Sequence, residues 1–145
     1  MILRKAEIKD LAILAELACQ LWPDHTIDEM RAEYADMIAK PDAAFFLAYV
    51  QETAVGFAQC QLRCDYVEGT DSSPVGYLEG IYVADAYRKQ GFAKALLTAC
   101  ESWAKSKGCC EFASDCELDN TQSLQFHLCV GFEEANRIIC FTKKL

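Results

Sequence analysis

The sequence predicts a single α+β domain over residues 1–145, in which about four helices flank a mixed, mostly antiparallel central sheet. Three observations lead to this fold class. The length suits one domain, because domains commonly contain about 100 to 150 residues. Runs rich in β-branched and aromatic residues stand beside runs with helical apolar spacing, so both kinds of element are present. The order of these runs, β-α-α-β-β-β-α-β-α-β, groups three strands together and favours a mostly antiparallel sheet.

The composition is that of a globular protein with a clear excess of acidic residues. The formal net charge of −8 argues against binding to a nucleic-acid backbone or to an anionic membrane. It is compatible with a cationic small molecule or a basic peptide as the partner. No apolar run approaches the ~20 residues of a membrane span, and no secretion signal follows Met1, so we expect a cytoplasmic protein. The nine cysteines form no set with metal-ligand spacing, which predicts reduced thiols and no metal.

The first third of the chain predicts a short strand over residues 2–5, followed by two helices. Asp10 is a good N-cap for the first helix, whose apolar residues recur every three or four positions. Pro23 ends this helix. Thr26 and Glu29 have the spacing of a capping box, which predicts the start of the second helix.

The rest of the chain predicts a hairpin, a central strand, and two helices that each precede a strand. The hairpin turns at Glu52 and Thr53, and a polar loop over residues 64–75 leads to the central strand. The apolar residues between Arg137 and Lys143 predict a last strand whose edge needs a partner. The predicted strands cover residues 2–5, 44–50, 54–63, 77–83, 111–115 and 133–144, and the predicted helices cover residues 11–21, 27–38, 91–107 and 121–130.

The segment between the central strand and the next helix contains Arg88-x-x-Gly91-x-Ala93. A strand, a glycine loop and a helix N-terminus together make an anion site, because the first N–H groups of a helix are unpaired. The Walker ending Gly-Lys-Ser/Thr and the dinucleotide pattern Gly-x-Gly-x-x-Gly are both absent. The pattern resembles the pyrophosphate loop of the GCN5-related N-acetyltransferase (GNAT) superfamily, which binds acetyl-coenzyme A.

A second motif agrees with this resemblance. Asn120 is followed eleven residues later by Gly131-Phe132, as in the superfamily motif whose Asn contacts the pantetheine arm, and Asn120 is also a plausible helix N-cap. The order of elements is also that of the superfamily. The resemblance implies that acetyl-coenzyme A is bound by Ile81, Tyr82, Val83, Arg88, Lys89, Gln90, Gly91, Phe92, Ala93, Lys94 and Asn120.

Several further blocks resemble one branch of the superfamily, the short chromosomal aminoglycoside 6'-N-acetyltransferases. They include Leu21-Trp22-Pro23, the Asp-Ser-Ser-Pro-Val block at 71–75, the Leu-Glu-Gly-Ile block at 78–81 and Ala-Ser-Asp at 113–115. The resemblance implies direct acetyl transfer to the 6'-amine of these antibiotics, and hence resistance to them, by a homodimer. The implied acceptor residues are Trp22, His25, Tyr66, Glu79, Asp115 and Asn136, the last where relatives tend to carry Glu.

The residue types suit a polycation. Carboxylates bind ammonium groups by charge-assisted hydrogen bonds, and aromatic rings flank a sugar or take a cation on one face. Each residue also has an ordinary structural interpretation when it is taken alone. Asp115 is the first candidate for the general base and Glu79 the second. His127 stands where many superfamily members carry a general-acid Tyr, and it either donates a proton to the thiolate or is a structural helix residue.

Two other functions stay open at this point. One is acetyl transfer to a polyamine or a protein amine, which an acidic cleft would also suit. The other is a non-enzymatic acyl-coenzyme A-binding module. Such a module would keep Arg88, Gly91 and Asn120, but it would not need the acceptor residues together.

Overall fold

The computed structural model describes all residues from Met1 to Leu145 and has a five-stranded sheet with the order β1-β2-β3-β4-β5. Strands β1 to β4 pair antiparallel in sequence order, and β5 pairs parallel to β4. The predicted α+β class with four helices is therefore confirmed. The strands are β1 (Ile2–Lys5), β2 (Ala43–Val50), β3 (Thr53–Arg63), β4 (Val75–Val83) and β5 (Phe112–Ser114). The α-helices are α1 (Leu11–Leu21), α2 (Ile27–Met37), α3 (Phe92–Ser106) and α4 (Thr121–Cys129), and the 3-10 helices are η1 (Ile8–Asp10) and η2 (Asp85–Tyr87).

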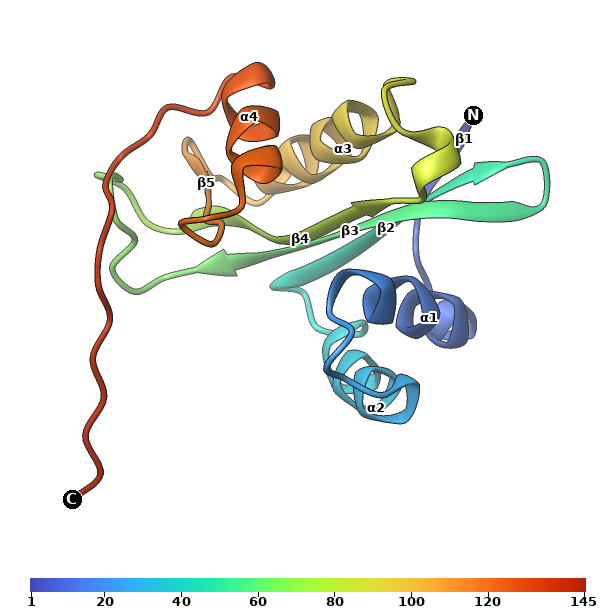
Figure 1. The fold of residues 1–145 in the computed structure, drawn as a ribbon, viewed down its shortest axis with the longest axis horizontal. Coiled ribbons are helices and arrows are strands. Elements are labelled where there is room, and N and C mark those ends of the chain that lie inside the picture. The colour runs from blue at the N-terminus through green and yellow to red at the C-terminus, as the bar shows by residue number, and fades with distance from the viewer.

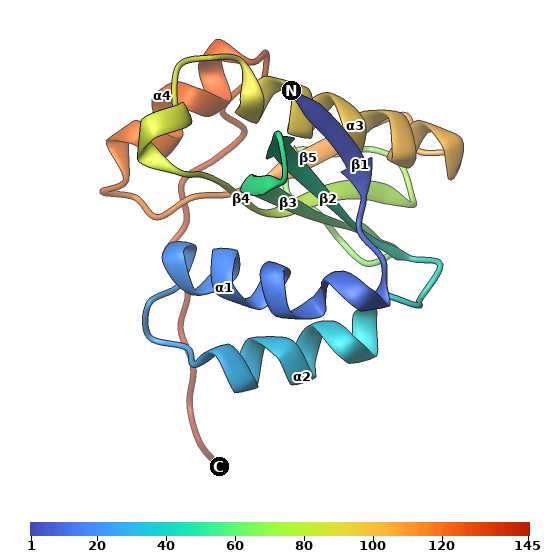
Figure 2. The ribbon, with the colours of Figure 1, turned by 90° about the vertical axis from the view of Figure 1, so that its right-hand side faces the viewer.

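The helices cover both faces of the sheet. Helices α1 and α2 lie against one face, and α3 and α4 lie on the other (Figures 1 and 2). Strand β2 alternates accordingly, because Phe45 and Leu47 pack with the α1–α2 core while Phe46 packs with the α3 core. Both faces of this strand are buried, so its apolar run is nearly continuous. None of the helices combines the length and apolar character needed to span a membrane.

The two predicted helix starts differ in outcome. Thr26 and Glu29 form the predicted capping box, with N–H to side-chain oxygen distances of 3.2 and 3.1 Å. Asp10, by contrast, does not cap α1 with its side chain. Its carboxylate accepts a hydrogen bond from the Glu7 N–H at 2.8 Å and pairs with Arg4 at 2.7 Å. Asp10 is therefore the N-cap residue of α1 as predicted, but its side chain belongs to the capping box of η1, which leads directly into α1.

Strand β4 is irregular where the site lies. Gln59 of β3 faces Gly80, and the next residue of β3 faces Leu78, so Glu79 is the extra residue of a β-bulge. Bulges redirect a side chain and often adjoin active sites. On its other side β4 pairs with β5 only as far as Leu78 and Ser114, and then continues alone to Val83. The two strands therefore separate next to the bulge.

The predicted last strand does not form within this chain. Residues 133–145, here called the C-terminal arm, have no regular secondary structure and are almost entirely exposed. The arm leaves α4, passes the end of the sheet and extends away from the body (Figure 1). A strand needs a neighbour to satisfy its backbone groups, and the arm reaches no sheet edge of its own chain. Its large exposed apolar residues are Ile138, Ile139, Phe141 and Leu145.

Candidate active site

The loop before α3 has the geometry of an anion site. Gly91 is the N-cap of α3 and has φ +87°, a left-handed conformation that glycine adopts without strain. The space beside its Cα is open, with no atom within 4 Å of where a Cβ would lie. The first N–H groups of α3, from Phe92 to Lys94, have no partner within the helix. Together with the helix dipole they favour a phosphate group at this position.

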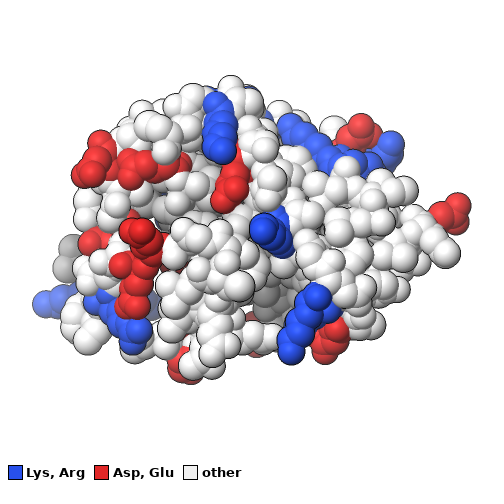
Figure 3. Space-filling model, turned by 90° about the horizontal axis from the view of Figure 1, so that it is seen from above, with Lys and Arg blue, Asp and Glu red and all other residues white.

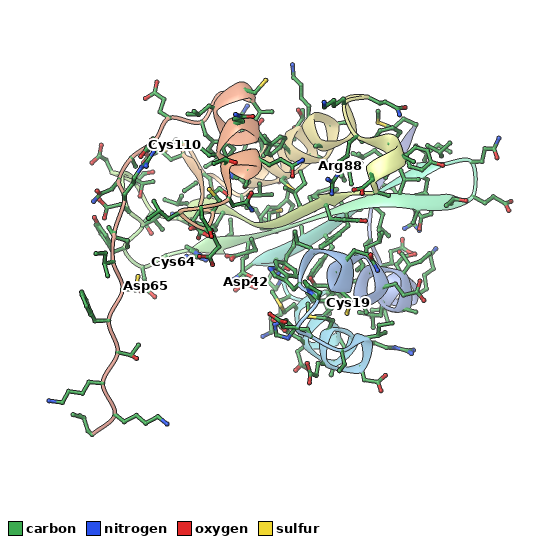
Figure 4. The ribbon with its side chains drawn as sticks, viewed as in Figure 1. Cys19, Asp42, Cys64, Asp65, Arg88 and Cys110 are labelled. Carbon is green, nitrogen blue, oxygen red and sulfur yellow. The ribbon has the colours of Figure 1, made fainter.

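Arg88 fastens this loop to the end of β4. Its Nε donates to the Val83 carbonyl at 2.9 Å, and its Nη2 pairs with Asp85 at 3.0 Å. The guanidinium also lies 6.0 Å from the centre of the Tyr82 ring. Arg88 lies beside η2 above the sheet (Figure 4). Two of the guanidinium's nitrogens are thus bound within the chain. These contacts hold the loop, with its backbone N–H groups, in place at the end of β4.

The edge of β4 beyond Leu78 is the second part of the cofactor side. Since β5 ends at Ser114, the β4 backbone from Ile81 to Val83 has no strand beside it on that side. Asn120 begins α4, and its Oδ1 accepts the Ser123 N–H at 3.0 Å. The N-cap interpretation of Asn120 is therefore correct, and its amide nitrogen makes no hydrogen bond within the chain, which leaves it able to contact a ligand.

A cavity of about 230 Å³ lies on the face of the sheet that α1 and α2 cover. It is bordered by β3, β4 and the segment that joins the two helices. Trp22 forms one wall and packs directly on Gly80. A Cβ at position 80 would come within 2.4 Å of the Trp22 ring, so this contact requires glycine. The cavity brings together three of the predicted acceptor residues, and its lining consists of Trp22, His25, Met30, Glu33, Gln59 and Glu79.

Glu79 is bound by a residue that the sequence did not point to, Arg63 at the end of β3. The Arg63 guanidinium donates three hydrogen bonds of 2.9 to 3.0 Å to the two Glu79 oxygens. The same guanidinium lies over the Tyr77 ring, 3.4 Å from its centre. The Tyr77 hydroxyl in turn donates to Asp115. Both predicted base candidates thus belong to one connected array.

The environment changes the acid–base properties of this array. Burial raises the pKa of Glu79, and the charge of Asp115 raises it further, while the bonded Arg63 lowers it; the net direction is upward. Burial and the hydrogen bond to Asp115 also raise the pKa of Tyr77. Glu79 is therefore a stronger proton acceptor than an exposed glutamate, which is the property that a general base needs near neutral pH.

Two predicted acceptor residues lie in a separate cluster. Tyr66 is 81% exposed, and its hydroxyl donates to Glu68 at 2.6 Å. The Asn136 side chain donates to the other oxygen of Glu68 at 3.1 Å. The structure therefore links Tyr66 and Asn136 to each other, through Glu68, and does not link them to Glu79 or Asp115. Tyr66 lies on the loop over residues 64–74, and Asn136 lies on the C-terminal arm. Cys64 and Asp65, which are labelled in Figure 4, mark the start of the loop.

His127 lies at the point where β4 and β5 separate. Its Nδ1 is 2.7 Å from the Ser123 carbonyl and its Nε2 is 2.8 Å from the Ser114 hydroxyl. A carbonyl oxygen only accepts, so in the neutral ring Nδ1 carries the proton and Nε2 accepts from Ser114. Ser114 is the last residue of β5. His127 is therefore more than a helix surface residue, since it is bonded to the end of the strand that borders the split.

Charge is unevenly distributed on the face that carries α3 and α4. Acidic side chains gather at the end of the molecule where α4 lies, while basic side chains lie mainly over the centre and the opposite part (Figure 3). Four residues of these arrays carry no signal in the sequence, namely Arg63, Tyr77, Glu68 and Ser114. Arg63 stands in an acidic chain at a strand end, but only the strand register shows that it reaches Glu79.

The chain belongs to the acetyltransferase (GNAT) family, whose sequence model matches residues 11–132. This confirms the superfamily predicted from the Arg88–Ala93 loop and from the Asn120–Phe132 motif. The chain is 43% identical to the aminoglycoside N(6')-acetyltransferase type 1 of Salmonella typhimurium, over 86% of both chains. It is 41% identical to the protein of the same name from Stenotrophomonas maltophilia, over 99% of this chain and 93% of that one.

Solved structures resemble the fold over its whole length. AAC(6')-Iy in complex with the bisubstrate analogue CoA-S-monomethyl-acetylneamine has a TM-score of 0.95 and 40% identity, over 99% of this chain and 98% of that one. The aminoglycoside antibiotic 6'-N-acetyltransferase AAC(6')-IG from Acinetobacter haemolyticus has a TM-score of 0.95 and 38% identity, over 100% and 99%. A further AAC(6')-Iy structure, in complex with CoA, has a TM-score of 0.96 and 40% identity, over 99% of this chain and 95% of that one.

Proposed function

We propose that this protein transfers the acetyl group of acetyl-coenzyme A to the 6'-amine of aminoglycoside antibiotics, and so confers resistance to them in the cytoplasm. One observation carries the proposal, namely that β4 lies between two different sites. On the cofactor side it has an anion-binding loop at its end and an unpaired edge. On the acceptor side it borders an acidic cavity with a tryptophan wall. The relatives named for this reaction support it, with identities near 40% over nearly the whole chain. The nine free thiols suit a reducing compartment.

Acetyl-coenzyme A would occupy the side of β4 that faces β5. The backbone around Gly91 and the first N–H groups of α3 would hold the pyrophosphate. The edge from Ile81 to Val83 would pair with the pantetheine amides, as an added strand does. Asn120 would contact the same arm through its free amide nitrogen. An N–H of β4 would then polarise the acetyl carbonyl, in the manner of an oxyanion hole.

The aminoglycoside would enter the cavity on the other side of β4. Glu79 and Asp115 would bind ammonium groups, and Trp22 would flank a sugar ring. His25 borders the same cavity and would contact the acceptor there. Tyr66 and Asn136 would contact a more distant part of the acceptor, from the cluster that they form with Glu68.

The amine must lose a proton before it attacks. With the lysine reference pKa of ~10.4, about one amine in a thousand is neutral near pH 7.4, which costs ~4 kcal/mol if nothing assists. Glu79 is the better base of the two candidates on structural grounds, because burial raises its pKa. The amine nitrogen bonds to the acetyl carbon as the carbon–sulfur bond breaks. In its imidazolium form His127 would donate from Nε2 to the Ser114 hydroxyl, which would pass its own proton to the thiolate.

The protein would act as a homodimer. Ile138, Ile139 and Phe141 are exposed on an arm that finds no partner within its own chain, and a second copy could cover them. Light scattering after gel filtration tests this part. We expect the mass of a dimer for the native chain and that of a monomer when Ile139 and Phe141 are both replaced by Lys. A native chain with the mass of a monomer would contradict it.

Mass spectrometry of the products tests the function itself. Acetyl-coenzyme A is incubated separately with kanamycin, tobramycin, a 6'-hydroxyl analogue, spermidine and a basic peptide. We expect one acetyl group on kanamycin and tobramycin and none on the 6'-hydroxyl analogue. Acetylation of spermidine or the peptide alone would favour the alternative acetyltransferase, and coenzyme binding without any transfer would favour a binding module. Mass detection avoids thiol reagents, which the cysteines would consume.

A further inference from the structure

Arg63 is the cation nearest to the proposed acceptor site, and it is not among the residues that the sequence or the family resemblance pointed to. Its three hydrogen bonds to Glu79 are unevenly shared. Nε and Nη2 both donate to Oε1, at 3.0 and 2.9 Å, while only Nη2 donates to Oε2, at 2.9 Å. A carboxylate oxygen accepts about two hydrogen bonds. Oε1 is therefore saturated, and Oε2 keeps one free position beside the cavity that Glu79 lines.

The guanidinium is itself held in a fixed plane. It lies over the Tyr77 ring at 3.4 Å, and the Tyr77 hydroxyl is fixed by Asp115. A planar fork of this kind orients its carboxylate partner, which a lysine ammonium cannot do in the same way. The array therefore runs from Glu79 through Arg63 and Tyr77 to Asp115, across β3, β4 and the end of β5.

We propose that Arg63 is a positioning residue for the acceptor: it holds Glu79 ionised with one oxygen free for the substrate's ammonium, and through Tyr77 it fixes Asp115 in the same array. This inference rests on the proposed function, because it assumes a cationic acceptor. Two carboxylates and one guanidinium leave a single net negative charge, so the array matches one ammonium group of the substrate. The remaining ammonium groups of the acceptor must bind elsewhere.

Arg63 keeps the pKa of Glu79 lower than burial alone would make it. Burial and Asp115 raise the pKa of Glu79, and Arg63 is the group that opposes them. Without Arg63 the pKa of Glu79 rises further, so the carboxylate is lost at a higher pH as the solution is acidified. The titratable and charged groups around Glu79 are Arg63 of β3, Tyr77 of β4, Asp115 after β5, and His25 and Glu33, which line the cavity from the α1–α2 region.

Steady-state kinetics of two variants test this role on an aminoglycoside that the native protein acetylates. For Arg63→Gln we expect the KM for the acceptor to rise about tenfold, as for the loss of one charge-assisted contact. The KM for acetyl-coenzyme A should stay within about twofold, and the acid limb of kcat/KM should move to higher pH. Arg63→Lys should restore the acid limb but not the KM, because it returns the charge without the fork.

Arg31→Gln in α2 is the matched control, since it removes one positive charge from an exposed residue that does not line the cavity. It should leave both KM values and the pH profile unchanged. An Arg63→Gln variant with the native acceptor KM and the native acid limb would overturn the inference. So would an equal rise in the KM of both substrates, because that pattern indicates a general disturbance of the fold.

A second measurement does not depend on activity. The carboxyl carbon of Glu79, assigned by comparison with Glu79→Gln, is titrated by NMR in the native protein and in Arg63→Gln without substrate. We expect the midpoint to move to higher pH in Arg63→Gln, and an unchanged midpoint would overturn the role of Arg63. If the native protein acetylates no aminoglycoside, the proposed function fails, while this titration still decides whether Arg63 keeps Glu79 ionised.

Discussion

The two sides of β4 are built in different ways. The cofactor side consists mainly of backbone from one continuous segment, Ile81 to Lys94, with the N-terminus of α3 at its centre. The acceptor side consists of side chains from separate segments, including Trp22 after α1, Arg63 at the end of β3 and Asp115 after β5. The first can be found from a short motif, whereas the second exists only once the sheet has formed. Changes on one side should therefore leave binding on the other side largely intact.

The largest expected effect is on the cofactor side. Gly91→Val places a β-branched residue at φ +87° and fills the open space where the pyrophosphate would lie. We expect kcat/KM for acetyl-coenzyme A to fall about a hundredfold, with acceptor binding retained. Kinetics and calorimetry check this. Gly108→Val is the matched control, because Gly108 also has a left-handed φ (+88°) but lies at the other end of α3. If Gly108→Val weakened coenzyme binding as much, the effect would be one of stability.

The next effect is on the acceptor side. Glu79→Gln removes the negative charge that pairs with Arg63 and replaces one of the two accepting oxygens by an NH2 group. We expect kcat/KM for the aminoglycoside to fall about thirtyfold with coenzyme binding unchanged. In the native protein the same parameter should fall as the pH drops through the raised pKa of Glu79, since only the carboxylate accepts a proton.

Asp115→Asn is the comparison for Glu79→Gln. The Asn side chain keeps an oxygen that accepts the Tyr77 hydroxyl, so a smaller loss of about tenfold is expected. A larger loss in Asp115→Asn than in Glu79→Gln would reverse the assignment and restore Asp115 as the base, which is the order that the sequence suggested.

Sequence reasoning succeeded where the information is local. The capping box of α2 and the start of α3 after the glycine loop are each set by neighbouring residues, and the structure has both as predicted. It placed Asp10 correctly at the N-cap of α1, but it could not show that the Asp10 carboxylate binds Arg4 and the Glu7 N–H, because the first contact depends on a residue of β1.

Two further failures have the same origin. The apolar pattern of the C-terminal arm predicts a strand, but a pattern cannot say whether a partner strand lies within reach. Arg63 was missed because its contact with Glu79 depends on the β3–β4 register and on the bulge at Glu79. The role of Tyr66 and Asn136 as acceptor residues stays a prediction, and the structure shows that both bind Glu68.

A smaller effect is expected from the tryptophan wall. In Gly80→Ala the new methyl group would lie 2.4 Å from the Trp22 ring and must displace it from the cavity. Overpacking of this kind costs about 1–3 kcal/mol, so the KM for the aminoglycoside should rise about tenfold. Circular dichroism and the melting temperature show whether the fold is kept. If the KM of acetyl-coenzyme A rose in parallel, the two sides of β4 would not be independent.

The smallest effect is expected at the split itself. His127→Gln removes the ring that would supply a proton to the Ser114 hydroxyl, so proton return to the thiolate should slow. Water can partly replace this group, and we therefore expect kcat to fall only about fivefold, less than for a full general acid. Neither substrate's dissociation constant should change. Stopped-flow measurement of coenzyme A release separates this loss from slow product dissociation, and a native kcat would return His127 to a structural role.

Calorimetric titration of two ligands into two variants shows whether the two sides of β4 bind their ligands independently. Coenzyme A and kanamycin are each titrated into Gly91→Val and into Glu79→Gln, with the native protein as reference. The separation of the two sides predicts that Gly91→Val loses coenzyme A affinity and keeps kanamycin affinity, while Glu79→Gln does the reverse. Loss of both ligands in both variants would contradict it, and would mean that the two sides of β4 form one indivisible site.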